Sequence, residues 1–282
     1  MAPLHDDDDG RPTTTNAADE ETETCEAMRD LVRGYKTFRA AHFSDDAGRG
    51  NGTTGTSSVK DTLRELSERG QAPSALVIAC CDSRADPAIV FATSPGEVFV
   101  VRNVANLVPP YTGVDGAHHG TCAAIEYSVQ HLRVPLILVM GHTQCGGAAA
   151  ALKKYGNGPN ADAGFLGANE ETGEGFIGSW INLAERVVCE VCEEHDPDIR
   201  ARMLEFELVK NSVKNLHTFP FIAGRVKAGE LEIRGAVFNV FNGTLKILQP
   251  NGRFVTPKDE DASDKSASTG VAPPDAKRAR EE

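Results

Sequence analysis

Three short apolar runs, with a helical segment between the second and the third, constrain the fold of this chain more than any other feature. The runs are ALVIACC (75–81), EVFVVRN (97–103) and VPLILVMGH (134–142), and the helical segment is HGTCAAIEYSVQHL (119–132). Continuous apolar runs of this length are typical of strands that are buried on both faces. Strand, helix and strand in this order predict an α/β domain with a central, mostly parallel β-sheet flanked by helices.

Helical periodicity is visible on both sides of this core. Apolar residues recur at helical spacing from Glu26 onward, and a second helix is expected between Ser58 and Gly70. Further helices are expected after Gly147, through 180–194 and over 203–216, with a Gly/Asn-rich loop at 156–175. The segment 231–248 predicts two strands joined by a turn at Asn242 and Gly243.

Composition divides the chain into one domain with two polar ends. Residues 1–24 have no periodicity, and the stretch from Asp6 to Glu26 holds nine acids and one base. We interpret 1–24 as a disordered acidic lead, 44–58 as a flexible loop within a domain spanning 25–256, and 257–282 as a disordered tail.

Charge and cysteine content narrow the class of protein. The net charge is −12, and without the acidic lead the body is only mildly acidic. The sequence has no basic stripe, so we expect no nucleic-acid partner. No apolar run reaches the roughly 18 residues that a membrane span needs, and the N-terminus lacks the apolar core of a signal peptide. Seven cysteines, an odd number, favour a reducing compartment. We expect a cytoplasmic protein, or an organellar one if a targeting segment has been removed.

Two of the predicted strands end in side chains that can bind a metal. The first ends in CCDSR, and the third is followed by GHTQCGG, which offers His142 and Cys145. Gly146 and Gly147 allow the backbone to approach closely there. A third ligand from Cys80 or Cys81 would complete a Cys₂His set with an open fourth position, which is the arrangement of a catalytic zinc.

Strand parity favours Cys80 as the third ligand. Successive side chains of a strand point to opposite faces, so Cys80, Asp82 and Arg84 share one side if the extended course continues. Arg84 would then hold Asp82 ionised beside the metal, whereas Cys81 would bring only Ser83 to it. A second set of candidate ligands, Cys189, Cys192 and His195, lies in a helical run without a fourth ligand nearby, and core or surface thiols are the better interpretation.

The motif pair CxDSR and HxxC resembles the β-class carbonic anhydrases. Segments 95–110 (PGEVFVVRNVANLVPP) and 123–129 (AAIEYSV) are also similar to that family, and the likeness runs from about Leu31 to Leu248. The resemblance implies one Zn²⁺ per chain, with Cys80, His142 and Cys145 as ligands and Cys81 as the variable residue of the motif. It also implies that Asp82 and Arg84 serve the zinc-bound water.

The plant-like branch of the family implies further site residues. The positions that match its substrate pocket are Gln71, Phe99, Val104, Tyr127 and Gly146, and the match to a proposed proton shuttle is His131. Gln71 is expected to reach across a subunit interface, so the active unit is expected to be a homodimer or a higher oligomer whose N-terminal helices pack on a partner subunit. Val77 stands where bicarbonate-regulated members carry Trp, which implies the open form of the site.

The resemblance implies reversible hydration of CO₂ to bicarbonate and a proton by hydroxide on zinc. Two alternatives are kept. The same zinc site could hydrolyse carbonyl sulfide or carbon disulfide, or the fold could serve as a non-catalytic scaffold. Asp82, Arg84 and Gln71 argue against the scaffold, because a scaffold has no use for them.

Overall fold

The computed structural model describes residues 25–43, 58–113, 119–156 and 175–258 of the chain. The predicted acidic lead, all but the last residue of the predicted 44–58 loop, and all of the predicted tail except residues 257 and 258 lie outside the described residues, as does most of the 156–175 loop. The chain divides into two compact units, residues 1–64 and 65–282, and the second unit contains the sheet.

Two N-terminal helices form as the periodicity predicts. Helix α1 spans Glu26–Phe43 and helix α2 spans Val59–Arg69. Helix α2 ends before Gly70, whose φ of +84° is a left-handed conformation that glycine adopts without strain. Helix α1 buries none of its residues, and its apolar side chains are exposed, among them Leu31 and Tyr35.

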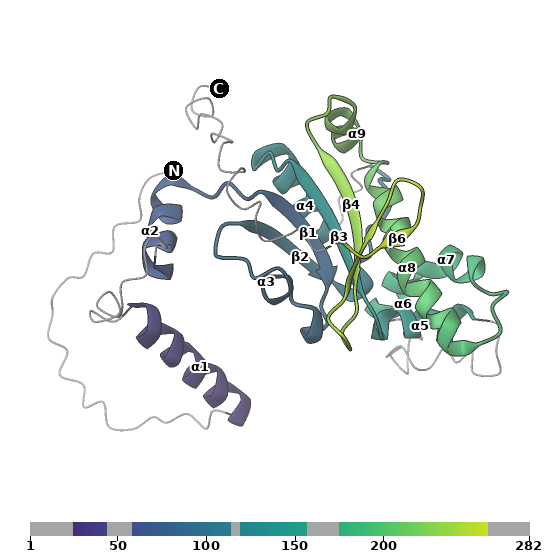
Figure 1. Ribbon diagram of the computed structural model, residues 1–282, viewed down its shortest axis with the longest axis horizontal. Helices are drawn as coiled ribbons and strands as arrows, with labels where there is room; N and C mark the ends of the chain where they lie inside the picture. Colours follow the sequence, from purple (N-terminus) through teal and green to yellow (C-terminus); the bar gives the residue numbers. More distant parts are fainter. Residues whose placement is uncertain (1–24, 44–57, 114–118, 157–174, 259–282) are drawn as a thin grey trace, which may run out of the picture. The chain divides into compact units, whose positions relative to one another are not determined.

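A six-stranded sheet forms the centre of the second unit (Figure 1). Its strand order is β2-β1-β3-β4-β5-β6, in which the first four strands run parallel and the last two pairings are antiparallel. The strands are β1 (Ala75–Cys80), β2 (Val98–Asn103), β3 (Leu136–His142), β4 (Glu232–Phe238), β5 (Leu245–Leu248) and β6 (Phe254–Val255). The predicted mostly parallel sheet is confirmed, and β6 is a short strand that the pattern did not predict.

Strand β1 is buried along its whole length, as a continuous apolar run predicts. Strand β2 differs from the prediction, because its residues are half-buried and Val100 is exposed. The reason is topological. Strand β2 is an edge strand that pairs only with β1, and an edge position cannot be read from an apolar run.

Helices pack on both faces of the sheet. Helices α4 (Gly120–Glu126), α8 (Pro197–Leu216) and α9 (Pro220–Lys227) share a core with the side chains of β1 and β3 that point to their face, including Ile78 and Ile137. The short helix α3 (Pro87–Val90) packs near Val77 on the opposite face. Helices α5 (Gly146–Tyr155), α6 (Phe176–Ile181) and α7 (Glu185–Glu190) lie with α8 in a second apolar cluster that contains Cys80 and Cys145.

Local geometry differs from the predictions at two places that flank the sheet. The predicted 119–132 helix ends in a π-helical turn, Tyr127–His131. The hairpin between β4 and β5 contains Asn242 and Gly243, but its loop is longer than a two-residue turn. Asn239 pairs with Thr244 across that loop, and its side chain also accepts the Phe241 N–H.

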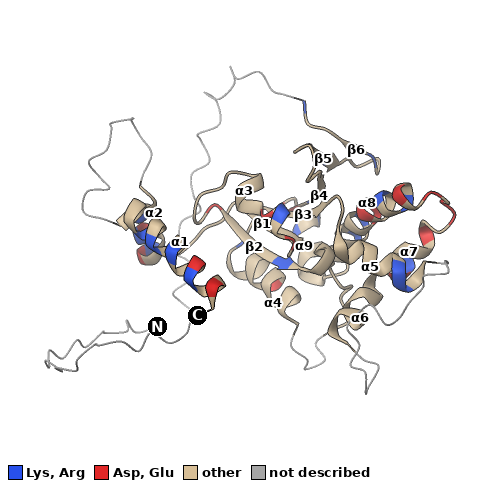
Figure 2. Cartoon of the chain, turned by 90° about the horizontal axis from the view of Figure 1, so that it is seen from below, with Lys and Arg blue, Asp and Glu red and all other residues tan. Residues whose placement is uncertain are grey.

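The register of the parallel strands sets the place of the site. Ala79 of β1 pairs with Met140 of β3, so Cys80 and His142 both lie at the carboxyl edge of neighbouring strands. Sites in open α/β sheets form at this edge. Within the described ranges, most charged residues lie on helices and few lie on strands (Figure 2). No helix in these ranges has the length and apolarity to cross a bilayer.

Candidate metal centre

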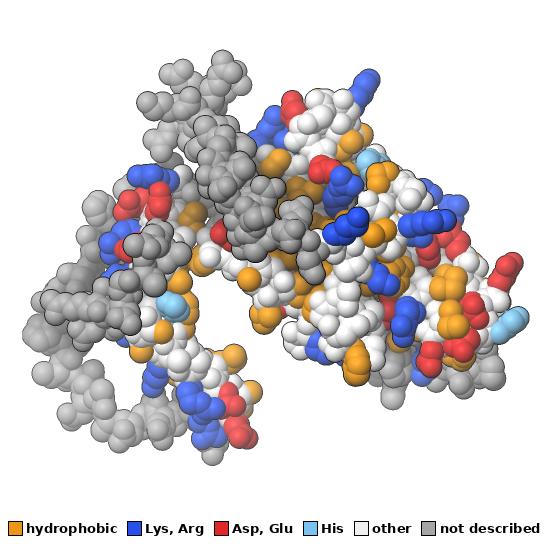
Figure 3. All heavy atoms as spheres, in the orientation of Figure 1, with side chains coloured by type: hydrophobic (Ala, Val, Ile, Leu, Met, Phe, Trp, Pro, Cys, Tyr) orange, Lys and Arg blue, Asp and Glu red, His pale blue; other side chains and the backbone are white. Residues whose placement is uncertain are grey.

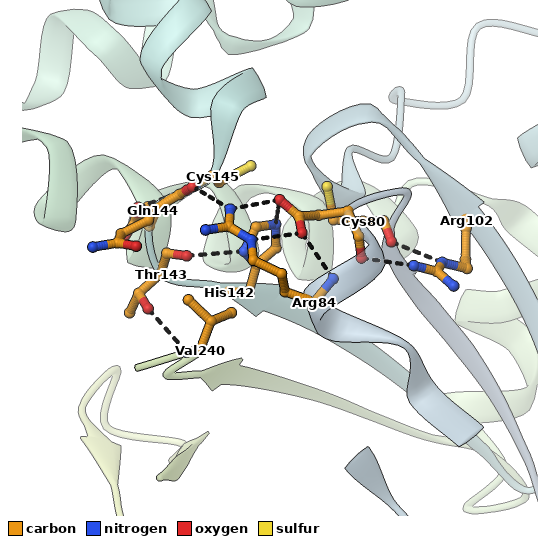
Figure 4. Close-up of polar contacts among 10 residues, drawn as sticks. Cys80, Arg84, Arg102, His142, Thr143, Gln144, Cys145 and Val240 are labelled. Atoms are coloured by element: carbon orange, nitrogen blue, oxygen red, sulfur yellow. Dashed lines mark hydrogen bonds and ion pairs between the residues drawn. The ribbon is translucent and has the colours of Figure 1, made fainter. Parts of the chain in front are cut away.

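Three side chains from two strand ends and one helix start converge at the carboxyl edge of the sheet (Figure 4). Cys80 is the last residue of β1, His142 is the last residue of β3, and Cys145 is the N-cap of α5. Their ligand atoms all lie within 4.8 Å of one another, and all three residues are buried. Two thiols and an imidazole at this spacing can hold one metal ion.

The imidazole of His142 fits a metal ligand. Its Nδ1 lies 2.9 Å from the carbonyl oxygen of Thr143, so Nδ1 carries the proton and donates it to that oxygen. Its Nε2 is buried and has no hydrogen-bond partner among the described residues. Buried polar atoms are rarely left unpaired, and an imidazole whose other nitrogen donates to a carbonyl is the usual form of a zinc-binding histidine.

The thiols of Cys80 and Cys145 lie close enough to change each other's pKa. The Cys145 thiol donates a hydrogen bond to Cys80, which with smaller contributions lowers the pKa of Cys80 to about 4. The same bond, together with burial, raises the pKa of Cys145. Burial tends to lower the pKa of His142, but the neighbouring Cys80 thiolate outweighs it and raises that pKa. These mutual shifts are those of groups that face one position.

The structure shows that Cys80, and not Cys81, belongs to the group of candidate ligands, but strand parity is not the reason. Cys80 is buried within the group, whereas Cys81 is exposed and lines a neighbouring pocket of about 640 Å³. The predicted extended course does not continue past Cys80. Asp82 caps a 3-10 helix, Ser83–Ala85, by accepting the Arg84 N–H at 2.9 Å, so strand parity does not apply to Asp82 and Arg84.

Asp82 and Arg84 form a forked ion pair, and Figure 4 shows Arg84 beside the three ligands. Arg84 Nε lies 2.9 Å from Asp82 Oδ1, and Arg84 Nη2 lies 2.7 Å from Oδ2. These hydrogen bonds hold the pKa of Asp82 well below its usual range. Asp82 Oδ2 is 3.9 Å from His142 Nε2, so an ionised carboxylate stands next to the metal position.

Arg84 also connects this pair to the loop between β3 and α5. Its Nη2 donates to the Gln144 carbonyl at 3.0 Å, which joins the Asp82 turn to the segment that carries Cys145. Gln144 has a φ of +57°, a left-handed conformation that is unfavourable for a side-chain-bearing residue. Backbone strain of this kind is found at functional sites where the surrounding contacts hold it in place.

A second arginine, Arg102 of β2, was not singled out from the sequence. Its Nε donates to the Cys80 carbonyl at 2.9 Å and its Nη2 donates to the Asp82 carbonyl at 2.7 Å, while Nη1 pairs with Asp86. These bonds hold the end of β1 and the turn that follows it. An arginine within an otherwise apolar strand run is the sequence signal that could have identified it.

The turn after β2 closes the site from the other side. Ala105 has a φ of +63°, and its backbone hydrogen bond to Cys80 is one of the causes that lower the pKa of that thiol. A Cβ on Gly147 would lie 2.8 Å from the Ala105 Cβ and 2.9 Å from Val104 Cγ1, so this close approach requires glycine. Gly146 has no neighbour within 4 Å of the corresponding position, so packing within the chain does not require glycine there.

The predicted pocket residues fall into two groups. Val104 packs against the apolar cluster that contains Cys80 and Cys145, and Gly146 directly follows Cys145 at the start of α5. Phe99 pairs with Leu76, four residues before Cys80, which places it about 13 Å away along the strand. Tyr127 packs against Phe99 with ring centroids 5.8 Å apart.

Gln71 and His131 belong to the same distant group. Gln71 lies four residues before the start of β1, and the ring of His131 is 5.3 Å from that of Tyr127. Within one chain, the structure therefore does not bring Gln71, Phe99 or Tyr127 to the metal ligands.

The second set of cysteines does not form a metal site. Among the residues that the structure describes, the only group that could hold a metal ion is Cys80, His142 and Cys145. Cys189 is exposed, and the Cys192 thiol donates to the Val188 carbonyl of the preceding helical turn. These cysteines are packing and surface thiols, as the helical context favoured.

Glu205 is a buried acid that sequence reasoning also missed. It lies on α8 among Leu204, Leu208 and Val209, and its Oε1 accepts the Cys145 N–H at 3.0 Å. The available signal was an acid placed within the apolar stripe of a helix. Charged side chains are seldom buried without a partner, so such a position marks a specific contact.

Comparison with known proteins agrees with this architecture. Residues 75–245 match the family model described as carbonic anhydrase. The chain is 34% identical over 191 residues to beta carbonic anhydrase 3 of Arabidopsis thaliana, covering 67% of this chain and 69% of that protein.

Two solved structures extend the likeness to the fold. The β-carbonic anhydrase CcaA matches with a TM-score of 0.67 and 27% identity over 82% of this chain and 92% of that one. A tetrameric β-carbonic anhydrase of Sordaria macrospora matches with a TM-score of 0.55 and 29% identity over 81% and 95% of the two chains. The chain belongs to the carbonic anhydrase family, in its β class. Members of this family are lyases, and the protein is an enzyme of that kind.

Proposed function

We propose that this protein catalyses the reversible hydration of CO₂ to bicarbonate and a proton, with one Zn²⁺ per chain held by Cys80, His142 and Cys145. The observation that carries the proposal is the convergence of these three ligands around an unpaired, buried His142 Nε2. Two sulfurs and a nitrogen suit Zn²⁺, and a three-residue set leaves one coordination position free for chemistry.

The remaining residues have roles that follow from their contacts. Bound Zn²⁺ lowers the pKa of a water ligand to about 7, which supplies a nucleophile for CO₂ at neutral pH. Asp82, kept ionised by Arg84, is available to accept a hydrogen bond from the attacking water. Val104 and Gly146, which flank the ligands, would border the space in which CO₂ is held.

We propose that the site adopts the open form, in which Asp82 does not bind the metal. Both carboxylate oxygens of Asp82 accept hydrogen bonds from Arg84, which supports this form, as does Val77 in place of Trp. Asp82 is also not among the residues that converge on the ligand cluster. A crystal structure of the zinc-loaded protein showing Asp82 coordinated to the metal would contradict it.

A complete active site is proposed to need two subunits. Gln71, Phe99 and Tyr127 lie at the opposite end of the strands from Cys80, so a second subunit must supply them if they contact CO₂. Gln71 would donate a hydrogen bond to a substrate oxygen, and His131, whose ring lies beside that of Tyr127, would pass protons to buffer.

Two observations support assembly of the chain. The relative from Sordaria macrospora is tetrameric. The apolar side chains exposed on α1, visible in Figure 3, fit a helix that packs on a partner subunit.

Stopped-flow CO₂ hydration tests the proposal. The zinc-loaded protein, the metal-depleted protein and two cysteine variants are measured from about pH 6.5 to 9, a range that brackets a water pKa of about 7. We expect a rate that rises with pH and requires zinc, is abolished by Cys80→Ser, and persists in the matched control Cys81→Ser. Zinc-loaded protein without a rate above buffer would contradict the proposal, and carbonyl sulfide and carbon disulfide would then be tested as substrates.

A further inference from the structure

We propose that Glu205 is a positioning residue for the metal centre, which fixes the Thr143–Cys145 segment so that Cys145 presents its sulfur to the metal. The inference rests on the proposed zinc site and concerns how the chain builds it. The residue comes from helix α8, 60 residues after Cys145 in the chain, and no metal-binding motif includes it.

Glu205 lies in a buried, mostly apolar position, where a carboxylate needs a specific hydrogen-bond partner. The residue is 8% exposed, and its Oε1 accepts the backbone N–H of Cys145 at 3.0 Å. The backbone N–H of Gln144 also interacts with the carboxylate. Neighbouring positions on α8 are Leu204, Leu208 and Val209, which are fully or almost fully buried. An apolar side chain would serve packing better at this position, so the acid is there for the two N–H groups.

The segment that Glu205 contacts is one that needs support. Gln144 adopts a φ of +57°, which side-chain-bearing residues disfavour. This conformation turns the Gln144 carbonyl toward Arg84 Nη2 at 3.0 Å, while the N–H groups of Gln144 and Cys145 turn toward Glu205. Arg84 and Glu205 therefore hold the segment from opposite sides. Loss of either contact would let Gln144 relax and move the Cys145 sulfur.

Zinc affinity, measured together with a rescue variant, provides the test of a positioning role. Metal-free wild type, Glu205→Ala and Glu205→Gln compete with a chromophoric chelator for Zn²⁺, and each is then loaded with Co²⁺ to record its absorption spectrum. We expect Glu205→Ala to lose about 10- to 100-fold in zinc affinity, the range found for residues that orient metal ligands. We expect Glu205→Gln to stay within a few-fold of wild type, because its amide oxygen can accept the same N–H.

A control and a rescue separate positioning from packing. Leu216→Ala also truncates a buried side chain of α8, in the other apolar core, and we expect it to lower the melting temperature without changing zinc affinity. In the Glu205→Ala background, Gln144→Gly should restore much of the lost affinity, because glycine adopts the left-handed conformation without support. If Glu205→Ala does not fold, Glu205→Asp replaces it, since its shorter side chain withdraws the oxygen from the Cys145 N–H.

The outcomes distinguish this inference from the proposed function. A wild-type chain that does not bind zinc would overturn both. Wild-type binding with unchanged affinity and an unchanged Co²⁺ spectrum in the folded Glu205 variant would overturn the positioning role alone. Lost affinity that Gln144→Gly does not restore would also overturn it, because Glu205 would then act by supporting α8.

Discussion

The proton content of three side chains decides how the proposed metal site takes up its ion. Cys80 is ionised well below neutral pH, with a pKa of about 4, because the Cys145 thiol donates a hydrogen bond to it. Cys145 keeps its proton, since the same bond and its burial raise its pKa. The Cys80 thiolate also favours the charged form of His142. A metal must therefore displace protons from Cys145 and, in part, from His142.

We predict that zinc uptake releases about one to two protons per chain at pH 7. The sign follows from the raised pKa values of Cys145 and His142: both groups bind protons that the metal must remove, so zinc affinity rises with pH. Titration calorimetry in two buffers of different ionisation enthalpy measures the number. Uptake without proton release, or an affinity that falls with rising pH, would contradict this description of the site.

Arg84 supplies a fork that lysine cannot reproduce. It bonds both Asp82 oxygens and the Gln144 carbonyl, whereas a lysine offers a single nitrogen. We expect Arg84→Lys to lower the CO₂ hydration rate by about tenfold or more. The pKa of Asp82 should rise toward its ordinary range, so activity should be lost at a higher pH on the acid side of the profile.

The matched control for this variant is Arg69→Lys. Arg69 pairs with Glu65 on exposed α2 and lies outside the proposed machinery. Stopped-flow pH profiles of both variants provide the measurement. A profile of Arg84→Lys that overlays wild type would show that the Asp82–Arg84 pair is only structural.

At the scale of elements, the site depends on how closely α5 approaches the turn after β2. Gly147, near the start of α5, faces Ala105 and Val104 at distances that leave no room for a Cβ. Within that turn, the backbone N–H of Ala105 donates a hydrogen bond to Cys80. The packing of one helix end thus fixes a hydrogen bond to a metal ligand on a different strand.

We predict that Gly147→Ala lowers the free energy of unfolding by about 1–3 kcal/mol, the usual cost of overpacking. Gly146→Ala is the control, because its position is open and its φ is not in the left-handed region. That substitution should be neutral, or stabilising by roughly 0.5–1 kcal/mol, since alanine favours the helix. Denaturant unfolding of the metal-free chains measures both. Equal stability of the two variants would show that the helix moves freely away from the turn.

At the scale of the whole molecule, the proposed site residues lie at both ends of the same parallel strands. The metal ligands lie at the carboxyl ends of β1 and β3, while Phe99 lies near the amino end of β2. About 13 Å of strand separates the two groups, which is too far for one small substrate to contact both. Two copies of the chain could join the two groups by placing the amino end of one sheet beside the carboxyl end of the other.

Mixing two inactive variants tests this arrangement. Cys80→Ser lacks a metal ligand but keeps the distant residues, whereas the double variant Gln71→Ala with Phe99→Ala keeps the ligands. A hybrid dimer of the two holds one complete site. We predict that an equimolar, co-refolded mixture recovers about a quarter of wild-type activity, because half of the dimers are hybrids with one of two sites intact. Recovery absent from a mixture with proven hybrids would show that each chain builds its site alone.

The sequence by itself determined the buried parallel strands and the chemistry of the candidate ligands. Short apolar runs bounded by loops are typical of buried strands, which made β1 and β3 predictable. Cysteine and histidine at two strand ends limited the metal chemistry. The sequence could not determine contacts that depend on where distant segments meet. The 3-10 turn at Asp82 depends on local backbone torsions. Three other features join residues that are far apart in the chain: the hydrogen bonds of Arg102 to the end of β1, the edge position of β2, and the buried contact of Glu205 with Cys145. Only the tertiary structure decided them, because periodicity reports the face on which a side chain lies and not the partner it meets.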